Sequence, residues 1–96
     1  MDKRTYNYES LKRHKVTENE CNEVTAEDNL TTEEFDYGYN KRVNWCLMFV
    51  GFTKKARLLE IGVEVIKIPD GYWTHIFHAD DATPRWQRRF NQRKRK

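Results

Sequence analysis

The chain has 96 residues, which fits one domain (1–96) with a modest hydrophobic core. Only 38% of the residues are hydrophobic, and the net charge is +3. The longest apolar run, residues 45–52, is far short of the roughly 20 residues that a membrane-spanning helix needs. The first 20 residues contain no apolar stretch typical of a signal peptide, so we expect a cytoplasmic protein without membrane contact. Cys21 and Cys46 lack C-x-x-C spacing and are predicted to be buried free thiols.

The charges are segregated along the chain. Residues 17–36 contain eight acidic and no basic side chains, whereas the segment from Pro84 onward contains seven basic and no acidic ones. This asymmetry is typical of a surface for a polyanion or an acidic partner, and the basic tail 91–96 belongs to it. The alternative is that both segments are solvated faces that keep the fold soluble.

Two helices are predicted in the N-terminal third. The first is expected over residues 6–14. The second runs from Thr17 to about residue 24, because Thr17 and Glu20 have the spacing of a capping box. An acidic connection, residues 25–34, follows.

Four strands come next, each marked by alternating or continuous apolar residues: 35–39, 43–52, 57–66 and 72–79. In the third strand, Leu59 and Ile61 lie on one face, while Glu60 and Glu64 point the other way. The sequence Pro69-Asp70-Gly71 predicts a tight turn before the last strand.

A C-terminal helix is predicted after the strands. Thr83 is expected to cap it, Pro84 takes its first position, and Trp86 and Phe90 fall one turn apart. The sequence therefore predicts an α+β fold with a small four-stranded antiparallel sheet, two N-terminal helices and one C-terminal helix, all packed on one sheet face.

The last predicted strand carries groups that could transfer protons. His75 and His78 are expected on opposite faces, which argues against a shared zinc ion, and no metal or cofactor is expected. His78 and Asp80 share a face, and a carboxylate beside an imidazole can tune it for proton transfer. The alternative is that Asp80 or Asp81 caps the last helix while His78 donates to a backbone carbonyl.

The cationic triplet Arg13-His14-Lys15 ends the first predicted helix. Its arginine and lysine could bind a phosphate, with His14 as proton donor or acceptor. The alternative is simple stabilisation of the helix C-terminus, which favours positive charge.

Three blocks of sequence together resemble the BrnT family of type II toxins. KRHKVTENE at residues 12–20 resembles the family's K-H-G-V-S-x-x-E opening. FVGFTKKARLL at residues 49–59 resembles its central G-x-T-x-x-G-R-L-L stretch, and HIFHADDAT at residues 75–83 resembles its closing R-I-I-S-A-R-x-A-T. The blocks occur in the family's order, and a basic helix follows them.

The resemblance implies a RelE-like fold and a metal-independent endoribonuclease, in which the 2′-OH of the RNA attacks the adjacent phosphate. It also implies a cognate antitoxin of the ribbon-helix-helix type. His14 matches the motif histidine and Arg57 the central arginine, while Arg13 replaces the motif lysine. The expected catalytic residues are therefore His14, Arg13, Arg57 and His78. Lys15, Arg85, Arg88 and Arg89 are expected to contact RNA.

Two positions depart from the family pattern. His75 and Asp80 stand where the closing block carries arginines. A carboxylate in place of a phosphate-binding cation would repel a phosphodiester. The competing hypothesis is therefore a non-catalytic binding module of the same fold, which binds a protein partner or nucleic acid.

Overall fold

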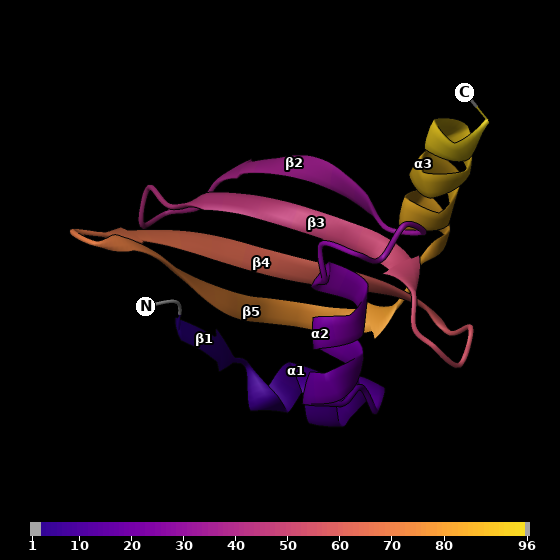
Figure 1. Cartoon of the computed structure of the whole chain (residues 1–96), viewed down its shortest axis with the longest axis horizontal. Coiled ribbons are helices and arrows are strands. Elements are labelled where there is room, and N and C mark those ends of the chain that lie inside the picture. The colour runs from indigo at the N-terminus through magenta and orange to yellow at the C-terminus, as the bar shows by residue number, and fades with distance from the viewer. Residues whose placement is uncertain (1–2, 96) are drawn as a thin grey trace.

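The computed structural model describes residues 3–95, which form an α+β fold of three helices and one five-stranded mixed sheet (Figure 1). The sheet order is β1-β5-β4-β3-β2. In chain order the elements are β1 (Lys3–Tyr6), α1 (Tyr8–His14), α2 (Glu18–Thr25), β2 (Glu33–Tyr39), β3 (Trp45–Phe52), β4 (Leu58–Ile68), β5 (Gly71–Asp81) and α3 (Pro84–Lys94).

The predicted antiparallel meander of four strands is present as β2 to β5. The prediction of a four-stranded, wholly antiparallel sheet is wrong, because β1 adds a fifth strand that pairs parallel to β5, from Lys3 opposite Trp73 to Tyr6 opposite Ile76. Helix α1 accordingly begins at Tyr8, not at residue 6. The four residues of β1 pair with residues about 70 positions away in the sequence. The residues around them therefore carry no signal for a strand.

The second helix confirms the capping box. The Thr17 hydroxyl accepts from the Glu20 N–H at 3.1 Å, and the Glu20 carboxylate accepts from the Thr17 N–H at 3.0 Å. Val16 and Cys21 flank this cap and are both buried. The cap therefore fixes the angle at which α2 leaves α1.

The helices cover both faces of the sheet, and the expectation that all of them pack on one face is wrong. On one face, α1 and α2 pack with alternate residues of β4, among them Leu59 and Ile61. On the other face, α3 inserts Trp86 and Phe90 against Phe35 and its neighbours on β3. Figure 1 shows α3 at the opposite end of the sheet from β1.

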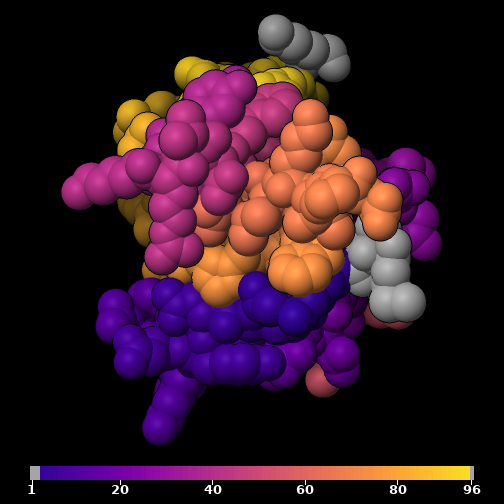
Figure 2. Space-filling model, turned by 90° about the vertical axis from the view of Figure 1, so that its left-hand side faces the viewer, coloured from indigo at the N-terminus to yellow at the C-terminus, as the bar shows by residue number. Residues whose placement is uncertain are grey.

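The uncovered end of the sheet is formed by the two long hairpins. The β2–β3 turn and the β4–β5 turn lie side by side there, above the N-terminal segment (Figures 1 and 2). Tyr39, Val43 and Tyr72 are exposed at this end, at 73%, 78% and 54%. Both cysteines, Cys21 and Cys46, are buried free thiols as predicted. Among the described residues, no helix is long and apolar enough to cross a membrane.

Two β-bulges break the strict alternation of side chains. One falls at Tyr37, between the pairs Asp36–Leu47 and Gly38–Cys46. The other falls at Phe77, because Gly62 pairs with His78 whereas Val63 pairs with Ile76. The inserted residue bends the strand and changes which face the following side chains occupy.

Candidate active site at the edge of the sheet

Helix α1 lies along the part of the β5 edge that β1 leaves unpaired. The Asn7 backbone N–H donates to the Ile76 carbonyl at 2.8 Å, and the Asn7 side-chain amide donates to the Phe77 carbonyl at 3.3 Å. One turn later, the buried Ser10 hydroxyl accepts from the Ala79 N–H at 3.1 Å. These bonds satisfy backbone groups that an edge strand would otherwise expose. They also bring the C-terminus of α1 next to the end of β5.

This arrangement brings His14 and His78 together, although 63 residues lie between them in the sequence. Their ring centroids are 6.0 Å apart and the ring planes are inclined by 65°. Each imidazole has its own carboxylate: His14 Nδ1 lies 3.2 Å from Asp80 Oδ1, and His78 Nε2 lies 2.8 Å from Glu60 Oε2. The two imidazoles are 26% and 31% exposed, so both can reach a ligand in solution.

The carboxylates determine which ring nitrogens are free. An ionised carboxylate can only accept a hydrogen bond, so the ring nitrogen facing it must carry the proton. His14 Nε2 and His78 Nδ1 therefore remain to take or give a proton. Two imidazoles held in this way can act as one general base and one general acid.

Glu60 links His78 to the last helix. Its side chain is only 4% exposed, and its Oε1 accepts from the Thr83 backbone N–H at 2.6 Å. Burial raises the pKa of Glu60, but the hydrogen bonds from His78 and Thr83 outweigh burial and lower this pKa below its usual range. Glu60 is therefore ionised at neutral pH and fixes the ring of His78.

The hydrogen bonds at the start of α3 differ from those predicted. Thr83 occupies the N-cap position, but its hydroxyl makes no capping hydrogen bond, and its own N–H donates to Glu60 Oε1. The alternative roles of the aspartates are also wrong: Asp80 contacts His14, and Asp81 contacts Arg57. His78 donates to a carboxylate, not to a backbone carbonyl.

Arg57 sits at the centre of the connections between α1, α2 and β5. Its Nε and Nη2 donate to the Asp81 carboxylate at 2.8 and 3.3 Å. Its Nη1 donates to the Glu20 carboxylate at 3.3 Å. The carbonyls of Lys15 and His14 accept from Nη1 and Nη2 at 2.8 and 3.0 Å. All five N–H donors of a guanidinium group are used by these contacts.

The ion pair between Arg57 and Asp81 keeps both side chains charged. The hydrogen bond to Asp81 raises the pKa of Arg57, and the same contact lowers the pKa of Asp81. Because the guanidinium holds the last two carbonyls of the α1 segment, it positions the backbone of His14. Arg57 is thus a positioning residue for His14, and its N–H groups are not free to bind a phosphate.

The other predicted residues fall into two groups. Arg13 and Lys15 are exposed on either side of His14 at the end of α1, where Lys15 adopts a left-handed conformation with φ of 54°. Arg85 and Arg89 lie on α3, each with its guanidinium over the Trp86 ring, at 5.2 and 4.8 Å from the ring centroid; Arg88 is exposed on the same helix. The structure therefore brings His14, His78 and Arg57 together with Arg13 and Lys15, whereas Arg85, Arg88 and Arg89 lie on α3.

The prediction that His75 and His78 lie on opposite faces of β5 is wrong, because the bulge at Phe77 lies between them. His78 pairs with Gly62 and His75 with Glu64, so both occupy the same sheet face, not opposite faces. They are nevertheless held apart, because His75 Nδ1 lies 2.7 Å from the Thr5 hydroxyl of β1. Within residues 3–95, no group of three or more His, Cys, Asp or Glu side chains is arranged to hold a metal ion.

Sequence reasoning missed Glu60 and Asp81 as members of the site. A glutamate in the middle of an otherwise apolar strand was the available signal for Glu60, because a carboxylate there is buried and requires a partner. The pairing of Asp81 with Arg57 depends on the register of β4 and β5, and the bulge at Phe77 makes that register hard to predict.

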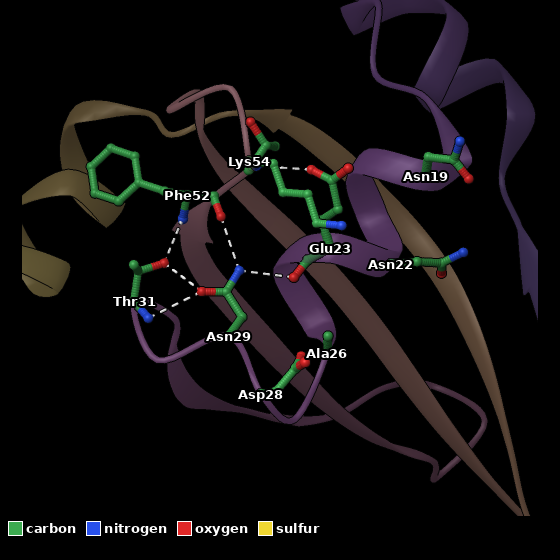
Figure 3. A pocket seen from close by; sticks show the side chains of 10 residues that line it. Asn19, Asn22, Glu23, Ala26, Asp28, Asn29, Thr31, Phe52 and Lys54 are labelled. Carbon is green, nitrogen blue, oxygen red and sulfur yellow. Dashed lines mark hydrogen bonds between the residues drawn. The ribbon is translucent and has the colours of Figure 1, made fainter.

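Another hollow lies between α2, the loop after it and the end of β3 (Figure 3). Its volume is about 610 Å³, and most of the residues that line it are polar. The Asn29 amide donates to the carbonyls of Glu23 and Phe52, and its oxygen accepts from the Thr31 N–H at 3.0 Å (Figure 3). These groups bond to one another and hold the loop in place. We therefore assign this hollow a structural role.

No known family model matches the chain, and no curated protein matches it either.

Proposed function

We propose that the protein is a metal-independent endoribonuclease of the BrnT-like, RelE-like kind, active in the cytoplasm and neutralised by a ribbon-helix-helix antitoxin. The observation that carries this proposal is the His14–His78 pair, with rings 6.0 Å apart and a separate carboxylate behind each ring. Two such imidazoles suit a reaction that removes one proton and supplies another.

In the proposed reaction, one imidazole takes the proton of the ribose 2′-OH. The 2′-oxygen then forms a bond to phosphorus while the bond to the 5′-oxygen breaks. The other imidazole donates a proton to that leaving oxygen. The products are a 2′,3′-cyclic phosphate and a free 5′-hydroxyl. Arg13 and Lys15, which are exposed beside His14, are the proposed phosphate contacts.

The departure at Asp80 fits this proposal. The carboxylate stands where the resemblance places an arginine, and it contacts His14 Nδ1 at 3.2 Å. In this geometry Asp80 orients the imidazole, so we assign it a positioning role. The second arginine of the family's closing block is thus replaced here by a carboxylate that pairs with an imidazole.

The test is cleavage of an unstructured RNA by His14→Ala, His78→Ala and the matched control His75→Ala. His75 lies on the same strand as His78, but its ring contacts Thr5. We expect each of the first two variants to cleave about 10²-fold more slowly, the loss typical of one acid–base group, and the control to cleave at the wild-type rate. Equal rates for all three variants would refute the proposal.

The second candidate is a non-catalytic binding module, and it is favoured by the local excess of carboxylates. Glu20 and Asp81 both contact Arg57, while Glu60 and Asp80 contact the histidines. With neutral imidazoles this cluster is negatively charged and would repel a phosphodiester.

Variants of Asp80 separate the two candidates. If Asp80 orients a catalytic His14, Asp80→Asn slows cleavage and Asp80→Arg abolishes it. If the wild type leaves RNA intact and Asp80→Arg begins to cleave it, the carboxylate had replaced a needed cation, and the binding module is the correct assignment.

A further inference from the structure

A second pocket lies on the same sheet face as His78, closer to the uncovered end of the sheet. Its volume is about 300 Å³, and its lining is mostly apolar. It combines three aromatic side chains with one carboxylate, one amide and one thiol: Tyr37, Tyr39, Phe77, Glu64, Asn40 and Cys46.

Glu64 is a nearly buried carboxylate with unused capacity to accept hydrogen bonds. The residue is 5% exposed, and its Oε2 accepts from the amides of Asn40 at 2.6 Å and Asn44 at 2.8 Å. Within residues 3–95, no hydrogen bond or ion pair reaches Oε1. A carboxylate offers about four acceptor positions, so about two remain open on Oε1.

The carboxylate is held in its charged form by its surroundings. The hydrogen bond from Asn44 lowers the pKa of Glu64 most, burial opposes it, and Asn40 and the nearby Arg42 add to the lowering. An ionised carboxylate cannot donate, so the complementary ligand must supply N–H or O–H groups. Arg42 already compensates part of the charge, and the ligand need not be a cation.

The aromatic walls favour a flat ligand. The Tyr37 and Phe77 rings are 6.2 Å apart and inclined by 34°, and Tyr39 is 73% exposed beside them. Aromatic side chains on an open sheet face are suitable platforms for stacking the bases of single-stranded RNA.

The sheet register places this pocket next to the histidine pair. His78 pairs with Gly62, and Glu64 lies two residues further along β4, about 7 Å away at the usual rise of a strand. The ring of Phe77 lies against Gly62, between the two. A base in the pocket would therefore belong to a nucleotide at or next to a phosphate held by the histidines.

We propose that this pocket binds a guanine base of the RNA, stacked on the aromatic walls and donating its N1–H and N2–H to Glu64 Oε1. Guanine is the base whose pairing edge presents two adjacent N–H donors, which match the two open acceptor positions of this carboxylate. Adenine and cytosine present an amino group beside an acceptor, which an ionised carboxylate would repel. This inference rests on the proposed endoribonuclease and names its base preference.

Binding is measured first, without any need for cleavage. Calorimetric titration of the full chain with the four nucleoside 3′-monophosphates is expected to give the tightest binding for guanosine, by about tenfold or more. Inosine 3′-monophosphate, which lacks the amino group, should bind more weakly than the guanosine nucleotide. Glu64→Gln should remove the preference, and Glu34→Gln, an exposed glutamate on β2, should leave it intact.

Cleavage is measured second, on an RNA that contains every dinucleotide step. We expect cuts at guanosine in the wild type, and cuts without base preference in Glu64→Gln and Tyr39→Ala. The control is Tyr72→Ala, which removes an exposed tyrosine from the neighbouring hairpin. Circular dichroism spectra establish that each variant is folded.

The possible results separate this proposal from the one on which it rests. Preferential guanosine binding by a protein that cuts no RNA would support the pocket and refute the endoribonuclease. Cleavage without base preference in the wild type would refute the pocket alone. Binding of N-acetylarginine amide in place of any nucleotide would also refute it, and would assign the pocket to a basic partner protein.

Discussion

Phe77 and Gly62 face each other across β5 and β4, and the ring occupies the place of the missing side chain. A Cβ built on Gly62 would lie 2.6 Å from the ring carbon Cζ of Phe77, closer than such atoms approach. This contact accommodates the bulge that sets the direction of His78. We predict that Gly62→Ala destabilises the fold by about 1–3 kcal/mol, the usual cost of an added methyl group in a packed site. Thermal unfolding measures it.

A double variant tests whether the loss of stability in Gly62→Ala arises from contact with the Phe77 ring. Gly62→Ala combined with Phe77→Leu should be less destabilised than the sum of the two single changes, because the smaller side chain leaves room for the methyl group. Strict additivity would show that the two residues do not interact.

Glu60 makes the stability depend on pH. Its pKa is lowered in the folded state, so it stabilises the protein above the usual glutamate pKa of 4.5, and this contribution is lost as the pH falls through the lower folded value. Glu60→Gln should therefore unfold more easily than the wild type at pH 7, by about 1–3 kcal/mol. The difference should shrink at pH 3. Urea denaturation at both values measures it, and an equal difference at both would contradict the assignment.

Arg57→Lys tests the positioning role of the guanidinium. Lysine keeps the charge but has three donors from one atom and cannot reach Asp81, Glu20 and the helix carbonyls together. We expect a loss of stability of about 1–3 kcal/mol. We also expect changed NMR chemical shifts for the His14 ring and unchanged shifts for the His75 ring. Arg88→Lys, on the exposed side of α3, should alter neither property.

The basic surface of α3 is predicted to bind RNA through its phosphates. Arg85 and Arg88 are exposed, whereas Arg93 and Lys94 already contact Glu33, at 3.6 and 2.8 Å. Removing one exposed arginine should lower the slope of log K against log salt by about 0.7–0.9, as expected for one phosphate contact. Arg88→Gln is the test. Removing residues 93–96 should change the slope less per charge, because two of these cations are paired with Glu33.

The parts of the fold that could be predicted from sequence are those specified by neighbouring residues. The Thr17–Glu20 cap and the turn at Pro69-Asp70-Gly71 depend on contacts within four positions, and both predicted boundaries agree with the structure. The alternation of Leu59 and Ile61 also gave the buried face of β4 correctly. Local chemistry was sufficient in each case.

The parts of the fold and the site that were not predicted depend on contacts between residues far apart in the sequence. β1 is a strand only because the edge of β5 is available, and the Phe77 bulge exists only because Gly62 leaves room on the opposite strand. Residue types gave His14 and His78 as site candidates, the family resemblance added Arg57, and the structure brings these three together. Their partners Glu60 and Asp81 are placed by the register between β4 and β5, and the alternation of apolar residues along a strand does not specify that register.

The pairing of β1 with β5 has a consequence for the protein during its synthesis. β1 and α1 leave the ribosome before β5, on whose edge they dock, has been made. Until then His14 has neither Asp80 nor His78 beside it. The two imidazoles therefore meet only after β5 has been made and has paired with the segment that carries α1. If the proposed endoribonuclease activity is correct, the chain cannot cut the message from which it is being translated before β5 has left the ribosome.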